Sequence, residues 1–282
     1  MGYKTGTVKA RLLKFNVGKN HRRYWFNDDP IKTLHANTLT ASIPYGEQFF
    51  IACVLPHIKT IKDRAKRRNA IQFAQQERNH SKEHFRLFLK TVKPYYPKLK
   101  VKNNLYQKLF QVVALLVGSK IRLAMVAAME HFTAVTGELY IREPELLSGI
   151  DEQIYLLWQW HFIEELEHKA VAFDILKTVS NNYFVRATGF FLAASFLMIG
   201  FSSAYWHMAI QDKLHTKLSF YRRSYQFFWG KSGLLRRLCW PYLRYLKPSF
   251  HPNDTVLDAE QNLLLEKLQL IEKQLEFGQG GK

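Results

Sequence analysis

Potential metal ligands are concentrated between residues 160 and 169, where the chain reads Trp-His-Phe-Ile-Glu-Glu-Leu-Glu-His-Lys. Each residue of an α-helix turns by about 100°, so His161, Glu165 and His168 fall within roughly 60° of one another on one stripe. Imidazole nitrogens and carboxylate oxygens on a common stripe can bind a metal ion together. Glu165 and His168 also have the Glu-x-x-His spacing with which four-helix bundles hold carboxylate-bridged metal pairs.

A second Glu-x-x-His pair, Glu77 and His80, occurs earlier in the chain. A dinuclear site in a four-helix bundle also needs one Glu from each of two further helices. Glu47 precedes the first pair and Glu130 lies between the two pairs, both in apolar helical surroundings. The order Glu, Glu-x-x-His, Glu, Glu-x-x-His therefore predicts a dinuclear metal site. The alternative is a set of solvated helix faces and capping residues.

We expect this site to hold two metal ions through carboxylates and imidazoles. Glu47, Glu77 and His80 would bind one ion, and Glu130, Glu165 and His168 the other, with Glu77 and Glu165 as bridges. His161 would be a seventh ligand that gives one ion two histidines; the alternative is a core histidine satisfied by a hydrogen bond. Oxygen- and nitrogen-rich ligands without a thiolate suit iron or manganese better than structural zinc, so we expect iron, with manganese and zinc as alternatives.

We expect other roles for the polar residues beside these ligands, judged from their positions on the helices. Glu164 would orient a ligand imidazole from across the bundle, as outer partners of metal ligands commonly do. His84 ranks below the seven as a ligand. Glu138 and Glu167 would face solvent or pair with basic residues, and His131 would be structural or support the site from outside.

Apolar residues at helical spacing predict the elements that must position the ligands. The four bundle helices are expected at 44–60, 64–92, 103–142 and 151–179. Pro44 suits the first turn of its helix, Asp151 is the N-cap of the last helix, and Gly118 marks a kink or break. The chain is thereby divided into an N-terminal arm at 1–40, a metal-binding bundle at 41–182, an apolar helix at 183–210, and a basic aromatic segment with an amphipathic helix at 211–282.

The composition is that of a globular protein with a substantial core. The 282 residues are 47% apolar and 15% aromatic, enough for one large domain or two small ones. Cys53 and Cys239 lie far apart and have no metal-ligand spacing, which agrees with a thiol-reducing compartment. The first residues contain no apolar signal core, so we expect no secretory signal peptide.

The formal net charge of +18 predicts a polyanionic partner, either nucleic acid or an anionic membrane. The uncharged stretch 187–205 is near the length needed to cross a bilayer core of about 30 Å. Residues 213–247 are dense in basic and aromatic residues, which together prefer anionic membrane surfaces. An amphipathic helix follows at 254–277. We therefore expect an anionic membrane surface as a partner and no nucleic acid.

The apolar stretch 187–205 can be arranged in three ways. A single crossing would put the basic segment and the bundle on opposite sides, although the positive-inside rule and the metal chemistry favour the cytoplasm for both. The stretch therefore either enters the bilayer and returns, or forms a buried helix, or is joined in the lipid by residues 109–126. Among these we favour a monotopic cytoplasmic protein that is bound to the inner face of the membrane.

Four segments around the ligands resemble the bacterial family described as predicted metal-dependent hydrolase. These segments are 44–50, 73–84, 129–134 and 160–174, within a resemblance that covers roughly residues 8–250. The ligand order is also similar to that of the di-iron p-aminobenzoate N-oxygenase type, in which the last element is His-x-x-x-Glu-x-x-His. That second resemblance implies that His161 is the extra histidine ligand.

These resemblances lead to two alternatives for the function. The first is an all-α, ferritin-like four-helix bundle whose di-iron centre activates dioxygen to oxidise a small hydrophobic substrate. It would require an electron donor, and a homodimer is left open. The second is a two-metal hydrolase of an ester or phosphoester. A metal-storage or membrane-remodelling protein is the non-enzymatic alternative.

Overall fold

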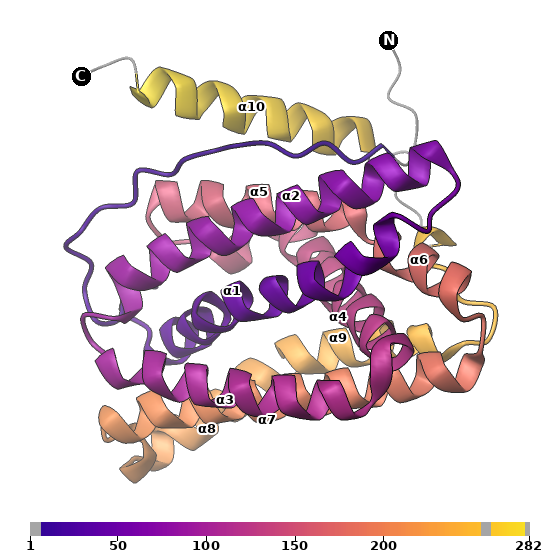
Figure 1. The fold of residues 1–282 in the computed structure, drawn as a ribbon. Coiled ribbons are helices and arrows are strands. Elements are labelled where there is room, and N and C mark those ends of the chain that lie inside the picture. Colours follow the sequence, from indigo (N-terminus) through magenta and orange to yellow (C-terminus); the bar gives the residue numbers. More distant parts are fainter. Residues whose placement is uncertain (1–6, 255–260, 280–282) are drawn as a thin grey trace.

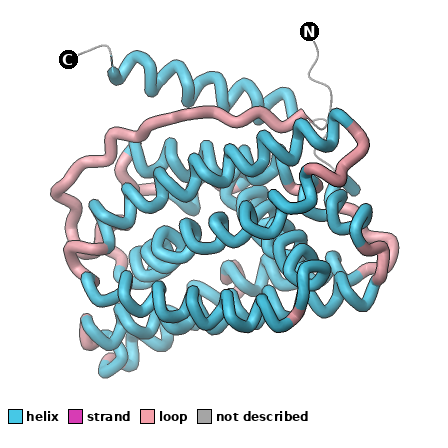
Figure 2. The backbone as a smooth tube through the Cα atoms, viewed as in Figure 1, coloured by secondary structure: helices cyan, strands magenta, loops and turns pink. Residues whose placement is uncertain are grey.

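The computed structural model describes residues 7–254 and 261–279, and Figure 1 shows them as helices joined by loops. Figure 2 shows no strand in this part of the chain, so the all-α prediction is confirmed. Four helices form a bundle: α1 (Pro30–Ile58), α2 (Arg64–Leu87), α4 (Gly118–Arg142) and α5 (Glu152–His168). α1 packs against α2, α2 against α5, α5 against α4, and α4 against α1, which closes the bundle.

The first bundle helix begins earlier than predicted. α1 starts at Pro30, where Asp29 caps it by accepting two backbone hydrogen bonds. The prediction that a new helix opens at Pro44 is wrong, because α1 continues through this residue. A proline inside a helix leaves the carbonyl four residues before it, here that of Thr40, without its backbone donor, and α1 continues despite this loss. Ser81 of α2 donates to the carbonyl of Pro44 itself and fixes the two helices at this level. α1 therefore runs across the predicted boundary at 40–41, and the division into four segments stays a prediction.

Two of the predicted helices are divided by local turns. Gly118 has a φ of +77°, a left-handed conformation that glycine adopts easily, and it separates α3 (Pro97–Leu116) from α4. The break predicted there is confirmed. The helix expected at 151–179 is also two helices, α5 and α6 (Val171–Val179), although Asp151 caps the first as predicted. The turn between them lets α6 bury Phe173 and Leu176 against α4.

The remaining helices cover the bundle from outside. A π-helical turn at Phe88–Val92 follows α2, and α7 (Tyr183–Gln211) packs along α4. α8 (Leu218–Trp229) and α9 (Leu234–Leu243) come next, and α10 (Gln261–Gln279) lies on α5. Figure 1 shows α3, α7 and α8 along the lower edge of the molecule and α10 along the upper edge. α10 corresponds to the amphipathic helix predicted at 254–277; residues 255–260 of that prediction lie outside the described part of the chain.

The N-terminal segment runs as an extended chain between α2 and α10 (Figures 1 and 2). Side chains of α2 supply its hydrogen-bond partners: Gln72 accepts from the backbone of Ala10, and Asn79 donates to the carbonyl of Arg11. Burying the Arg11 side chain, which is 6% exposed, requires partners for its charge. This segment therefore brings a cation to the outside of the bundle.

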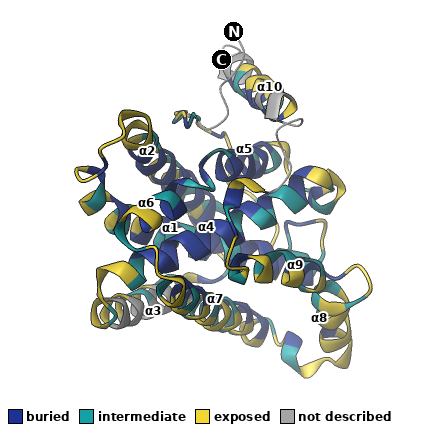
Figure 3. Cartoon of the chain, turned by 90° about the vertical axis from the view of Figure 1, so that its right-hand side faces the viewer, coloured by how far each residue is buried: buried dark blue, intermediate teal, exposed yellow. Residues whose placement is uncertain are grey.

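Burial distinguishes the bundle helices from α7. Figure 3 shows α1, α4 and α5 largely buried and the outer helices with exposed faces. Among the described helices, α7 alone is long and apolar enough to cross a membrane by length and composition. Only 22% of its most apolar 18-residue window is buried, so α7 is not the mostly buried helix that one alternative expected.

Candidate metal centre

The seven predicted ligands come from all four bundle helices and meet inside the bundle. α1 contributes Glu47, α2 contributes Glu77 and His80, α4 contributes Glu130, and α5 contributes His161, Glu165 and His168. None of these residues is more than 3% exposed. The structure thus brings together every residue that the ligand pattern singled out. Their role as metal ligands stays a prediction.

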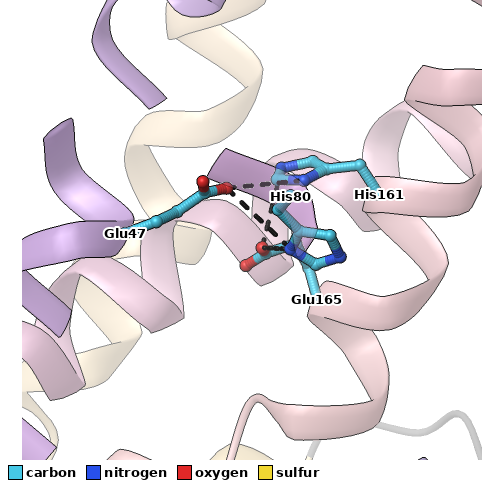
Figure 4. A group of neighbouring side chains, drawn as sticks. All are labelled: Glu47, His80, His161 and Glu165. Carbon is cyan, nitrogen blue, oxygen red and sulfur yellow. Dashed lines mark ion pairs between the residues drawn. The ribbon is translucent and has the colours of Figure 1, made fainter. Parts of the chain in front are cut away.

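The first group of ligand atoms consists of Glu47, His80, His161 and Glu165, and one atom from each lies within 4.8 Å of the others. Figure 4 shows their side chains converging on one point. His80 Nδ1 lies 3.6 Å from Glu165 Oε1, and His161 Nδ1 lies 3.8 Å from Glu47 Oε1. This group contains two imidazoles, as the prediction for His161 requires.

The second group consists of Glu77, Glu130 and His168. His168 Nε2 lies 3.2 Å from Glu77 Oε1 and 3.1 Å from Glu130 Oε2. Glu165 connects the two groups, because its Oε1 faces His80 at 3.6 Å while its Oε2 lies 3.4 Å from His168 Nε2. Two buried clusters could therefore each hold a metal ion, and Glu165 contacts both clusters.

The grouping of the side chains differs from the predicted division between two ions, and the two residues concerned are the predicted bridges. Glu77 falls into the group of Glu130 and His168 instead of the group of His80, and Glu165 is exchanged in the opposite direction. Residues three apart are separated by about 4.5 Å along a helix axis, close to the spacing of the ions in two-metal sites. The Glu and the His of one Glu-x-x-His pair can therefore face different ions.

Many ligand atoms are buried without a hydrogen bond. Both oxygens of Glu47, Glu77 and Glu130 lack one, as do Glu165 Oε2, His80 Nδ1, His161 Nδ1 and His168 Nε2. Buried polar atoms are nearly always paired, since an unpaired one costs free energy that folding must offset. Oxygen and nitrogen donors that converge in this way fit two divalent cations, which would satisfy all of them together.

Burial with few cations nearby raises the pKa of three of the four ligand carboxylates. Burial, followed by the Glu77 and Glu165 carboxylates, raises the pKa of Glu47 well above its usual range. Burial also raises the pKa of Glu77, and it raises the pKa of Glu130 to about 7, although His168 opposes both shifts. The pKa of Glu165 is lowered overall. Burial alone would raise it, but the neighbouring histidines have the larger combined effect and favour the ionised carboxylate. Cations in the cluster would favour the ionised form of all four acids.

The imidazoles divide into two kinds. Burial lowers the pKa of His80 and His161 to about 3, so both rings are neutral and have a lone pair for a metal. Their short distances to Glu47 and Glu165 are therefore contacts between prospective ligands, not ion pairs. Burial also lowers the pKa of His168, but nearby carboxylates outweigh this and raise it. His168 would release its proton when a metal binds.

A chain of hydrogen bonds runs behind the ligands and links the two groups. His80 Nε2 donates to Glu164 at 2.9 Å, and Arg11 donates to Glu164 at 3.0 Å and to Glu167 at 2.8 Å. Gln76 Nε2 donates to Glu167 at 2.9 Å. Because His80 donates from Nε2, its Nδ1 lone pair faces the cluster. The predicted orienting role of Glu164 agrees with this contact.

The other end of this chain orients His168. Its Nδ1 donates to Gln76 Oε1 at 3.0 Å, which leaves Nε2 as the nitrogen that faces Glu77 and Glu130. Sequence reasoning did not select Gln76 or Arg11. Gln76 is adjacent to the first Glu-x-x-His pair, which was a usable signal. Arg11 lies far from every motif, and nothing in its surroundings pointed to the site.

The other polar residues near the motifs have the roles expected from their positions. His131 contacts the backbone carbonyl of Pro241 at 3.1 Å and is structural. Glu138 pairs with Arg142 one turn away. His84 belongs to neither ligand group but is fully buried, and both of its ring nitrogens lack a hydrogen bond.

Comparison with known proteins places the chain in a family. The family model described as predicted metal-dependent hydrolase matches residues 9–255. No curated protein and no solved structure matches the chain. The family description contradicts the prediction of a dioxygen-activating oxidoreductase and agrees better with the alternative, a two-metal hydrolase. Because the match covers most of the chain and includes all seven residues of the buried cluster, this protein belongs to the predicted metal-dependent hydrolases.

Proposed function

We propose that this protein is a two-metal hydrolase that cleaves an ester of a hydrophobic substrate. The observation that carries the proposal is the buried cluster of four carboxylates and three imidazoles whose donor atoms converge in two groups. Two divalent ions held there would polarise an ester oxygen and activate water for attack. We propose iron for the two ions, with manganese or zinc as alternatives, because the donors are oxygen and nitrogen.

Charge favours a carboxylic ester over a phosphoester. Four ionised carboxylates and two divalent ions sum to zero, so the loaded centre would be neutral. In the described part of the chain, no Lys or Arg forms an ion pair with a ligand carboxylate, and Arg11 is already engaged by Glu164 and Glu167. A phosphate group would lack the cationic side chains that usually bind it.

Apolar and aromatic side chains exclude water around the ligands. Trp160 meets His80 edge-on with ring centroids 4.7 Å apart, and Phe73 meets His168 in the same way at 4.9 Å. All four residues are fully buried. These contacts hold the imidazole planes and keep the donor atoms in a dry environment, where electrostatic interactions are stronger than in water.

Unpaired polar atoms beside the cluster mark the side where we place the substrate. The His84 ring lies 4.7 Å from the rings of His161 and Trp158, and both of its nitrogens are unpaired. Thr40 of α1 also has an unpaired buried hydroxyl. Since α1 and α2 are fixed in register by the contact between Ser81 and Pro44, Thr40 falls at the level of His84. These groups would bind the polar part of the ester.

Two further expectations accompany this proposal. We propose that the hydrolase works in the cytoplasm at the inner face of the membrane, which suits a hydrophobic ester and the basic C-terminal region. A homodimer stays a prediction. The expected electron donor has no role in hydrolysis, which transfers no electrons.

The test compares metal-free protein with protein reloaded with iron, manganese or zinc under anaerobic conditions. We expect p-nitrophenyl esters to be cleaved only by the loaded protein, without oxygen, and p-nitrophenyl phosphate to be cleaved much more slowly. Glu165→Gln should lower metal content and ester cleavage by more than about 100-fold. Glu138→Gln, at a surface ion pair, should behave like the wild type. A protein that binds two ions per chain but cleaves none of these compounds would overturn the proposal.

A further inference from the structure

α7 carries an apolar stripe that no described part of the chain covers. Its inner face packs on α4, where a Cβ added to Gly189 would lie 2.5 Å from the Cβ of Ala124. On its outer face, five large apolar side chains are 55–77% exposed: Phe184, Phe191, Met198, Ile199 and Ile210. Their spacing keeps them on one side of the helix along nearly its whole length. Exposed apolar surface of this extent indicates a binding surface.

α3 and α8 widen the stripe into a face. Val112, Leu115 and Leu116 near the end of α3 are 56–82% exposed, and α3 packs beside α7. α8 lies against the C-terminal half of α7, where the rings of Trp206 and Tyr221 are 5.9 Å apart. Figures 1 and 3 both show α3, α7 and α8 along the lower side of the molecule. We call this surface the α3/α7/α8 face.

The charges of this face identify the kind of partner. The three helices contain no Asp or Glu, whereas Lys98 and Lys108 of α3 and Arg222 of α8 are exposed. Lys213 and Lys217, between α7 and α8, are also exposed. An anionic lipid surface offers acyl chains to the apolar residues and negative headgroups to the basic ones. A second copy of this chain would bring like charges together, which opposes pairing through the same face.

Both ends of α7 are fastened to the rest of the protein. At the start, Arg186 donates to the carbonyl of Lys247 at 2.7 Å. At the end, Asp212 pairs with Arg23 at 2.8 Å and accepts from Tyr96 at 2.6 Å. A helix held in this way along α4 cannot cross a bilayer without taking α4 and its buried carboxylate into the hydrocarbon, at a large cost in free energy.

We propose that the α3/α7/α8 face docks on an anionic membrane, with α7 lying in the plane of the bilayer surface and its exposed stripe among the acyl chains. The exposed tryptophan and tyrosine side chains of α7 and α8 would lie at headgroup level, where such rings concentrate. The bundle and its metal-binding cluster would stand above the membrane, on the cytoplasmic side. This inference does not depend on hydrolysis, because it uses no residue of the cluster.

The test is flotation of the full-length protein with vesicles of phosphatidylcholine alone or mixed in equal parts with phosphatidylglycerol. We expect flotation with the mixed vesicles and much less with phosphatidylcholine. The double variant Phe191→Asp, Ile199→Asp should bind the mixed vesicles at least about tenfold more weakly, since it loses buried apolar area and gains negative charge. Leu263→Asp with Leu270→Asp, on exposed positions of α10, is the matched control and should bind like the wild type.

Three results would overturn the proposal. The first is a double variant that folds, as judged by its circular dichroism, and floats like the wild type. The second is a wild-type dimer in the absence of lipid that the same double variant converts to a monomer, because a second copy would then cover the face. The third is a cysteine placed at one end of α7 that reacts with an impermeant thiol reagent only from inside sealed vesicles, since only a crossing helix carries one of its ends to the far side.

Discussion

Arg11 connects the outer partners of both ligand groups although it lies on the N-terminal segment. Its guanidinium reaches Glu164, which orients His80, and Glu167, which accepts from Gln76. A planar guanidinium can pair with two carboxylates at once, which a lysine ammonium does poorly. Arg11 therefore holds in place two acids that would otherwise be buried without a counter-ion.

Replacing this arginine should weaken metal binding without removing a ligand. In Arg11→Met the aliphatic volume is kept, but Glu164 and Glu167 lose their cation, so the imidazoles lose their fixed orientation. We expect metal affinity to fall about 10- to 100-fold, measured by competition with a chelator. Arg22→Met, which removes a surface ion pair with Asp28 at side chains 81% and 66% exposed, is the control and should change nothing. An Arg11→Met protein with wild-type affinity would show that the outer chain is not needed.

At the level of elements, the packing of α7 on α4 determines where the bundle ends and the outer layer begins. α4 carries Glu130 on one side and packs against α7 on another. Small residues meet at that contact, with Ala124 on α4 and Gly189 on α7. Backbones approach closely only where both helices present small side chains. The position of α7 is therefore specified by size complementarity, in addition to its apolar character.

A single methyl group should disturb this contact. In Gly189→Ala the new Cβ would lie 2.5 Å from the Cβ of Ala124, so α7 must move away from α4, and we expect a loss of about 1–3 kcal/mol in the free energy of unfolding. Gly46→Ala is a matched change, because there the nearest atom, Phe50 Cζ, is 3.9 Å away. Alanine should stabilise that helical position by up to about 1 kcal/mol. Urea unfolding followed by circular dichroism measures both, and equal effects of the two variants would contradict the packing argument.

For the whole molecule, the buried cluster is the place where metal binding would be coupled to stability. Four carboxylates are buried at the centre of the bundle, and burial raises the pKa of Glu47, Glu77 and Glu130. Without cations the fold keeps these acids at a cost in free energy. With two divalent cations the same residues tie all four bundle helices together. Metal binding should therefore stabilise the entire bundle, not only the site.

Removal of the metals should lower the melting temperature of the wild type. At a free metal concentration of one hundred times Kd, binding stabilises the folded state by about 2.7 kcal/mol, which is about 4–5 °C for a chain of this size. We expect this difference between reloaded and chelated protein in calorimetry. Glu165→Gln should melt at the same temperature with and without metal. If the melting temperature of the wild type is the same with and without metal, the cluster does not bind metal.

The residues that meet in the buried cluster could be predicted from the sequence because local spacing on a helix is determined by helix geometry alone. Two Glu-x-x-His pairs and His161 must lie on stripes, and a closed bundle turns those stripes inward. The all-α class, the break at Gly118 and the N-cap at Asp151 are local in the same sense, since each depends on a few neighbouring residues. Pro44 does not open a helix, because the packing of α1 against α2 outweighs the one hydrogen bond that a proline removes from a helix interior.

Contacts between segments far apart in the chain were decided by the tertiary structure alone. Arg11 reaches Glu164 and Glu167 because the N-terminal segment lies along α2, more than sixty residues away in sequence. The division of the ligands into two groups depends on how far each helix is shifted along its neighbours. Residue spacing within one helix does not reveal that shift. The sequence could not reveal the exposed face of α7 either, because an apolar helix packed on one side and an apolar helix buried on all sides have the same composition. By itself the sequence determined which residues could bind metal; the packing of the helices decided which of them meet, what holds them, and which apolar face stays exposed.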